Sequence, residues 1–133
     1  MWLLKTEPSA YGYDDLERDG KTVWDGVTNP VALKNIRAMK AGDRAFVYHT
    51  GEVKAVMGIA RVLRDPYPDP KGSDPRRVVV DLEAAGGLAR PVTLGEIKAL
   101  PGFADSPLVR QGRLSVVPLT AAQWKAIEDR GRK

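Results

Sequence analysis

The chain has 133 residues, a length that favours one domain and allows a core of its own. Hydrophobic residues make up 43% of it and charged residues 29%, which is the composition of a globular protein and excludes a disordered tail. Cysteine is absent, so disulfides, zinc fingers and thiol nucleophiles are excluded, and the formal net charge of +4 mildly favours polyanionic partners.

The start of the chain and its hydropathy bear on where the protein works. No apolar run approaches the ~20 residues of a membrane span, and residues 1–7 lack the charged start and long apolar core of a signal peptide. We therefore expect no membrane association and a cytoplasmic location. His49 is the only histidine, which argues against a histidine-rich metal site, and we expect neither a metal nor a cofactor.

The first elements of the chain are indicated by their boundary residues. Residues 2–7 are predicted to form a strand that stops at Pro8. The acidic residues before Gly20 indicate a short helix. Asn29-Pro30 predicts the start of a helix over 30–39, because asparagine caps a helix well and proline suits its first position.

The middle of the chain is rich in β-branched residues. Two strands are predicted over 45–50 and 55–63, and both look buried on each face, as in a barrel. The three prolines of 65–72 predict a rigid loop. A half-exposed strand is predicted over 78–83, and Gly86-Gly87 is interpreted as a turn.

The last third combines short helices with one strand. Capping boxes that begin at Thr93 and Thr120 predict two helices, the second with Trp124 and Ile127 pointing inward, and 113–118 is predicted to be a strand. Few helices are long enough to act as βαβ crossovers, which disfavours a doubly wound parallel sheet. We predict an α+β fold: one domain over 1–133, built as a small mixed or antiparallel β-barrel with short flanking helices.

Two polar and aromatic clusters are candidate binding sites. Trp24 and Asn29 lie together in a predicted irregular segment, where an indole can stack on a base and an amide can bond its edge. The alternative is a core tryptophan and an ordinary helix cap. Tyr48, His49 and Thr50 end a predicted strand, where they either line a site or form a barrel rim.

Catalysis has weaker support in the sequence. His49 is a candidate acid or base, but the chain has no nucleophile elbow, no His-Glu-x-x-His motif and no phosphate loop. The basic residues are dispersed. They form a phosphate-binding rim only if the fold gathers them at one mouth, and otherwise they are solvated faces. The candidates for contact with a nucleic-acid backbone are Lys34, Arg37, Arg110 and Arg113.

The order of motifs resembles that of the EVE-domain family over nearly the whole chain. In chain order the motifs are Trp2-Leu3-Leu4-Lys5-Thr6-Glu7-Pro8, Trp24-Asp25-Gly26-Val27 with Asn29, Met39-Lys40-Ala41-Gly42-Asp43, Tyr48-His49, Gly58-Ile59-Ala60, Tyr67-Pro68-Asp69-Pro70, Pro91-Val92-Thr93-Leu94, Ile97-Lys98 and Arg110-Gln111-Gly112-Arg113-Leu114-Ser115-Val116. The resemblance implies a PUA-like barrel related to the YTH, ASCH and PUA domains. YTH relatives read a methylated adenine in RNA, and EVE domains are associated with modified bases, notably modified cytosines in DNA.

The resemblance also implies which residues form the site. The ligand-binding residues would be Lys5, Thr6, Trp24, Val27, Asn29, Tyr48, His49, Thr50, Leu114 and Ser115. Three positions depart from the family pattern: Thr28 and Leu33 replace a common arginine, and Pro30 replaces an aromatic residue. Losing two cations should weaken contact with phosphate.

Three functions follow as hypotheses. The leading one is a non-enzymatic module that binds DNA or RNA and accepts one base, a modified one, in its pocket. The second is an enzyme that acts on a nucleotide or nucleic acid with His49 as acid or base. The third is a module that senses a small ligand or binds a protein.

Overall fold

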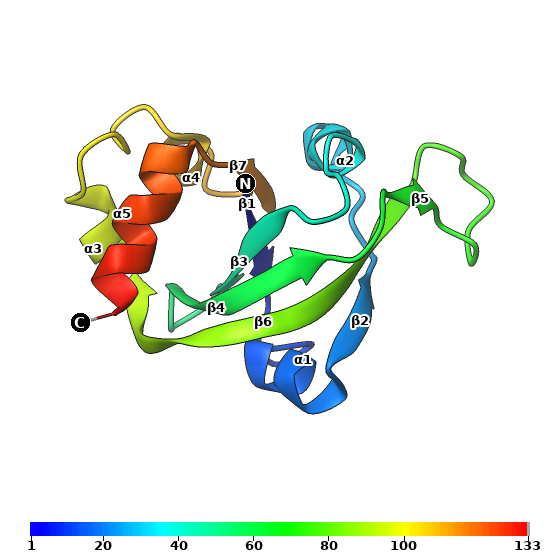
Figure 1. Cartoon of the computed structure of the whole chain (residues 1–133). Helices are drawn as coiled ribbons and strands as arrows, with labels where there is room; N and C mark the ends of the chain where they lie inside the picture. Colours follow the sequence, from blue (N-terminus) through cyan, green and yellow to red (C-terminus); the bar gives the residue numbers. More distant parts are fainter. Residues whose placement is uncertain (133) are drawn as a thin grey trace.

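The computed structural model describes residues 1–132 as one curled, mixed sheet with short helices around it (Figure 1). The seven-stranded sheet has the order β2-β6-β4-β3-β1-β7, and β5 pairs with β6 outside this path. The elements in chain order are β1 (Trp2–Thr6), α1 (Tyr13–Asp19), β2 (Lys21–Trp24), α2 (Pro30–Arg37), β3 (Arg44–His49), β4 (Ala55–Val62), β5 (Tyr67–Pro68), β6 (Val78–Thr93), α3 (Leu94–Lys98), α4 (Pro107–Arg110), β7 (Val116–Pro118) and α5 (Ala121–Gly131). None of the helices within residues 1–132 is long and apolar enough to cross a membrane.

Strand β1 lies inside the sheet and joins two strands that come much later in the chain. It lies between β3, to which it is parallel, and β7, to which it is antiparallel. The other pairs of the sheet are antiparallel. The predicted α+β class and the mixed, barrel-like sheet with short helices are therefore confirmed. The burial of β3, in which only Arg44 is exposed, agrees with a strand covered on both faces.

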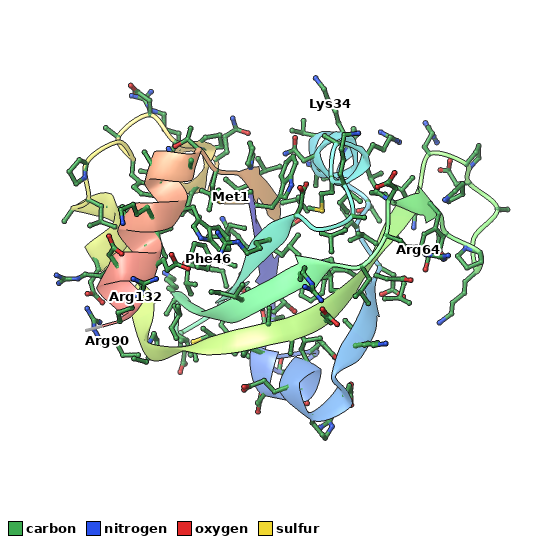
Figure 2. The ribbon with its side chains drawn as sticks, in the orientation of Figure 1. Met1, Lys34, Phe46, Arg64, Arg90 and Arg132 are labelled. Carbon is green, nitrogen blue, oxygen red and sulfur yellow. The ribbon has the colours of Figure 1, made fainter. Side chains whose placement is uncertain are left out.

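The core lies between the concave sheet and the helices that cover it. Phe46 of β3 stacks on Trp124 of α5, with ring centroids 3.7 Å apart and an interplanar angle of 13°. Figure 2 shows Phe46 between the sheet and this helix. Ile127, the other residue predicted to point inward, is also fully buried.

Predictions that rest on local capping chemistry are confirmed. The Asn29 side chain accepts hydrogen bonds from the backbone N–H groups of Val31 and Ala32, and Pro30 is the first residue of α2. The capping boxes at Thr93 and Thr120 start α3 and α5. The second helix ends at Arg37, two residues before the predicted end.

Predictions that depend on distant pairing are less accurate. Gly86 and Gly87 do not turn the chain: they lie within β6, where the pairing with β4 shifts register and Gly86 has a φ of +119°. Beside Gly86 the continuous strand has a bulge, because Ala85 has no partner in β4, and the positive φ of Gly86 is accommodated there without a Cβ. The strand predicted over 113–118 begins only at Val116.

Three short elements were not predicted. They are β2, α4 and the two-residue strand β5. β5 lies inside the stretch interpreted as a loop, where Tyr67 and Pro68 pair with the start of β6 at the sheet edge. Proline is tolerated there because an edge position does not need its N–H.

Candidate functional site

A cavity of about 750 Å³ opens between β1, β2 and the segment that leads into α2. Its volume lies in the range of small-molecule and cofactor sites. The residues that line it are Lys5, Thr6, Glu7, Tyr11, Thr22, Val23, Trp24, Asp25, Gly26, Val27, Thr28, Asn29, Lys71, Arg113 and Ser115. We call this cavity the Trp24 pocket. Among the residues singled out from the sequence, it includes Lys5, Thr6, Trp24, Val27, Asn29, Arg113 and Ser115.

The sheet order explains why residues so distant in sequence meet here. The backbone N–H of Lys5 in β1 donates to the carbonyl of Ser115, at 2.9 Å, so the segment that precedes β7 runs beside β1. On the opposite wall, Trp24 ends β2 and pairs with Val80 of β6. The chain then continues through 25–29 to the cap of α2, which closes the third side.

Trp24 is part of the core and also a wall of the pocket. Only 8% of the residue is exposed, and its ring meets Tyr11 edge to face, with centroids 6.4 Å apart and an interplanar angle of 84°. The sequence offered a core tryptophan and a pocket wall as alternatives, and Trp24 is both. An indole fixed by packing on one side presents a rigid apolar surface to whatever enters the pocket.

Several polar groups of the pocket are already engaged. The Thr6 hydroxyl donates to the carbonyl of Tyr11 at 2.7 Å, and the Asn29 Oδ1 accepts the two N–H groups of α2. The Asn29 Nδ2 and the Ser115 hydroxyl make no hydrogen bond with residues 1–132, so both are available to a ligand. An amide donor and a hydroxyl that donates or accepts are suited to the edge of a base.

The charged lining combines three cations with two carboxylates. The cations are Lys5, Lys71 and Arg113, and the carboxylates are Glu7 and Asp25. Lys5 is half-buried, its Nζ donates to the Gly112 carbonyl at 2.9 Å, and burial lowers its pKa from the usual lysine value. Arg113 is exposed and forms no ion pair within the described part of the chain, so it is free to contact an anion.

A second cavity, of about 350 Å³, adjoins the Trp24 pocket. Asn29 and Arg113 line both cavities, which makes them neighbours along one surface. Leu114 and Arg110 line only the second cavity. Arg110 forms an ion pair with Asp105 at 2.8 Å.

The remaining basic candidates lie away from both cavities. Arg37 donates to the carbonyl of Arg76 at 2.6 Å, an interaction that joins the end of α2 to the loop between β5 and β6. Lys34 points away from the sheet (Figure 2). Neither side chain is part of the lining of the Trp24 pocket.

The strand-end cluster lies outside the Trp24 pocket. Tyr48 is buried under Lys5, whose Nζ is 5.7 Å from the ring centroid, and Thr50 donates to the Thr6 carbonyl and to Glu7. His49 is only 7% exposed, and its Nε2 accepts the backbone N–H of Tyr13 at 2.9 Å. Since Tyr13 is the first residue of α1, the imidazole satisfies an N–H that the helix itself leaves unpaired.

This role gives His49 a measurable effect on stability. Burial lowers its pKa below the usual 6.5, and the opposing effects of Asp14 and Asp15 are smaller. The unfolded chain therefore takes up the proton first, and the stabilisation present above 6.5 is lost as the pH falls toward the lower pKa of the folded state. We expect the free energy of unfolding, measured in urea, to fall between roughly pH 8 and pH 5.

The control is His49→Gln, which keeps an acceptor without a titrating ring. Its unfolding free energy should change less over the same pH interval than that of the unsubstituted protein. Equal pH dependence of the two proteins would show that His49 is not the group responsible.

The sequence interpretation missed several residues of the Trp24 pocket. Thr22 and Val23 belong to β2, which was not predicted, and Tyr11 lies in the segment between β1 and α1. Lys71 comes from the proline-rich loop, more than forty residues from the rest of the wall. The β-branched and aromatic residues Thr22, Val23 and Trp24 are a weak strand signal, whereas no local signal places Lys71 at the same cavity as Trp24.

The curled, mixed sheet with short helices around it is a PUA-like α+β fold. The ASCH protein of Zymomonas mobilis has the same fold: the two superpose with a TM-score of 0.59 over 94% of this chain and 91% of that one, at 11% sequence identity. The EVE domain family model matches residues 1–130, and the chain belongs to the EVE domain family.

Two relatives of known structure are more similar. A protein of Rhodopseudomonas palustris, solved by NMR, is 43% identical, with a TM-score of 0.91 over 98% of this chain and 91% of that one. The human THYN1 protein, crystallised in complex with 5-methylcytosine-containing DNA, is 26% identical, with a TM-score of 0.91 over 99% of this chain and 97% of that one.

Proposed function

We propose that this domain binds DNA and accommodates a single modified cytosine base in the Trp24 pocket, without chemical change to the base. The observation that carries the proposal is the pocket itself: an open cavity of about 750 Å³ with a rigid indole in its wall and unpaired polar groups beside it. The complex of human THYN1 with 5-methylcytosine-containing DNA supports the same ligand class for this chain.

The lining suits a base that carries a methyl group. The indole of Trp24 offers a stacking surface, and base stacking on an aromatic side chain contributes ~1–3 kcal/mol. Val27 is half-buried in the same wall and offers an apolar contact to a methyl group. The Asn29 Nδ2 and the Ser115 hydroxyl are candidates for hydrogen bonds with the base edge.

A base can enter the pocket only if it leaves the stack. Extrusion costs a few kcal/mol and is easiest where the base is unpaired or already single-stranded. Arg113 and Lys71 lie on the rim and would hold the flanking phosphates. We assign backbone contact to these two residues, with Arg110 in the adjoining cavity, in place of Lys34 and Arg37, which lie outside it.

No specific observation favours catalysis or a small-ligand sensor. His49 is buried outside the Trp24 pocket, and its Nε2 is occupied by the N–H of Tyr13. It therefore cannot act as a base on a ligand in the pocket without releasing the start of α1. The cytoplasmic location stays a prediction from the sequence.

The proposal is tested by titrating short single-stranded DNA oligonucleotides that contain one 5-methylcytosine, with the unmodified sequence as control, at two salt concentrations. Contacts with phosphates weaken steeply with salt, whereas stacking and base-edge bonds do not. We expect a preference for the methylated strand that persists at the higher salt. Equal, salt-dependent affinity for both strands would refute recognition of the modified base.

A further inference from the structure

A third cavity, of about 280 Å³, shares Lys5 of β1 with the Trp24 pocket. Its cationic lining consists of Lys5 from β1, Lys54 from the loop before β4 and Lys98 from the end of α3. We call it the lysine cavity. Within residues 1–132, no acidic residue is part of its lining, and none of the three lysines forms an ion pair.

The three lysines share one concavity, and the carboxylate that borders it, that of Glu7, accepts a hydrogen bond from Thr50 at 3.2 Å and forms no ion pair with them among residues 1–132. Three ammonium groups around one concavity repel one another and raise the local potential, which favours the entry of an anion. Elsewhere in residues 1–132, basic side chains close together are paired with a carboxylate in some places: Arg90 and Arg130, for example, share Glu96, each at 2.7 Å. Lysines from three separate elements around one hollow favour an anion there.

The backbone holds Lys54 in place. It is the one non-glycine residue with positive φ among residues 1–132, at +47°, a conformation that costs energy for a residue with a Cβ. Its carbonyl accepts the N–H of Leu94, at 2.8 Å, which ties the loop to the start of α3. This contact fixes the loop that carries Lys54 against the helix that carries Lys98.

The lysine cavity and the Trp24 pocket have one lining side chain in common. Lys5 lines both, and its Nζ donates to the carbonyl of Gly112, which also lines the lysine cavity. Tyr48, buried beneath Lys5, also lines the lysine cavity. A strand whose base occupies the Trp24 pocket would pass Lys5, and with it the edge of this neighbouring cavity.

We propose that the lysine cavity binds a backbone phosphate of the strand whose base occupies the Trp24 pocket, through Lys54 and Lys98 and with Lys5 between the two sites. This inference rests on the proposed function for the identity of the strand. The chemistry of recognition is that of a phosphate dianion or diester with ammonium donors. Free inorganic phosphate has the same chemistry, so the test must separate the two sources.

The test compares the Lys54→Gln/Lys98→Gln variant with Lys40→Gln/Lys125→Gln, which removes the same charge from lysines outside all three cavities. Each protein is titrated with methylated and unmethylated single-stranded oligonucleotides over a range of salt, and separately with inorganic phosphate. Lys5 is left unchanged because it belongs to the proposed base pocket. Thermal unfolding of each variant verifies that the fold is retained.

We expect Lys54→Gln/Lys98→Gln to weaken binding of both oligonucleotides about equally, by roughly fivefold at low salt, while the control changes little. The slope of log K against log salt should decrease by about 0.7, the value for one phosphate of a single strand. The ratio of affinities for methylated and unmethylated strands should stay unchanged, because the base pocket is intact.

An unchanged affinity and slope in this variant would overturn the inference. So would loss of inorganic-phosphate binding without any change in oligonucleotide binding, since the cavity would then hold a free anion. If the unsubstituted protein shows no methylation preference but the variant has the smaller slope, the phosphate site stands and the proposed base recognition fails.

Discussion

Gly58→Ala is expected to destabilise the protein by about 3 kcal/mol, the upper end of what overpacking a core costs. A Cβ at Gly58 would lie 2.2 Å from Cζ of Tyr13 and 2.3 Å from Cε2 of the same ring. No real side chain tolerates such contacts, so strand β4 or helix α1 must move. Urea unfolding at neutral pH measures the change.

The clash cannot be relieved by a shift of the Tyr13 ring alone. The ring is 3% exposed, its hydroxyl donates to the carbonyl of Ile59 at 2.8 Å, and its backbone N–H is bonded to His49. Any movement must therefore displace the start of α1, which leads into β2 and the wall that carries Trp24. We expect the variant to lose DNA affinity as well as stability.

The matched control is Gly87→Ala. Gly87 pairs with Gly58 across β4 and β6, but the nearest atom to a Cβ there is 3.9 Å away, on the Glu17 carboxylate. Its unfolding free energy should stay within about 0.5 kcal/mol of the unsubstituted value. If Gly58→Ala lowers the free energy of unfolding no more than Gly87→Ala does, Tyr13 does not pack against β4 at Gly58 as described.

Trp24→Ala is expected to cost about 3–5 kcal/mol, as large-to-small substitutions of buried aromatic residues do. The substitution leaves a cavity beside Tyr11 and removes part of the pocket wall. Loss of DNA binding in this variant would therefore not distinguish a stacking residue from a core residue. Urea unfolding, which reports the free energy directly, measures the cost.

Two milder substitutions separate these roles. Trp24→Phe keeps an aromatic face, whereas Trp24→Leu fills part of the volume without one. Because stacking contributes ~1–3 kcal/mol, the leucine variant should bind a 5-methylcytosine oligonucleotide at least fivefold more weakly than the phenylalanine variant. Equal affinity of the two variants, with both folded, would show that Trp24 does not stack on the base.

The sequence predicts the fold well where the deciding chemistry is local. Asn29 and Pro30 identify the start of α2 because a cap and its N–H groups lie within three residues of each other. Gly86 and Gly87 are misread as a turn because two adjacent glycines are compatible with either a turn or a bulge. The two differ in which strand the flanking residues pair with, and here that strand is β4, some thirty residues earlier in the chain.

The same distinction applies to the pocket. Trp24 was singled out by its residue type and surroundings, and Lys5 and Ser115 by resemblance. Only the position of β1 beside β7 and the pairing of β2 with β6 bring the three to one cavity. The Tyr48-His49 pair shows what the sequence alone does not determine. Two polar side chains at a strand end look like a binding site, yet the direction of His49 is decided by its contact with α1.

The most direct test of the account uses the indole N–H resonances of the three tryptophans. In 15N-labelled protein, Trp24 lies in the pocket wall, whereas Trp2 is bonded to Asp43 at 3.0 Å and Trp124 is buried against Phe46. We predict that a 5-methylcytosine oligonucleotide shifts the Trp24 signal more than the unmodified strand does and leaves the other two in place. An oligonucleotide that binds without moving the Trp24 signal would contradict it.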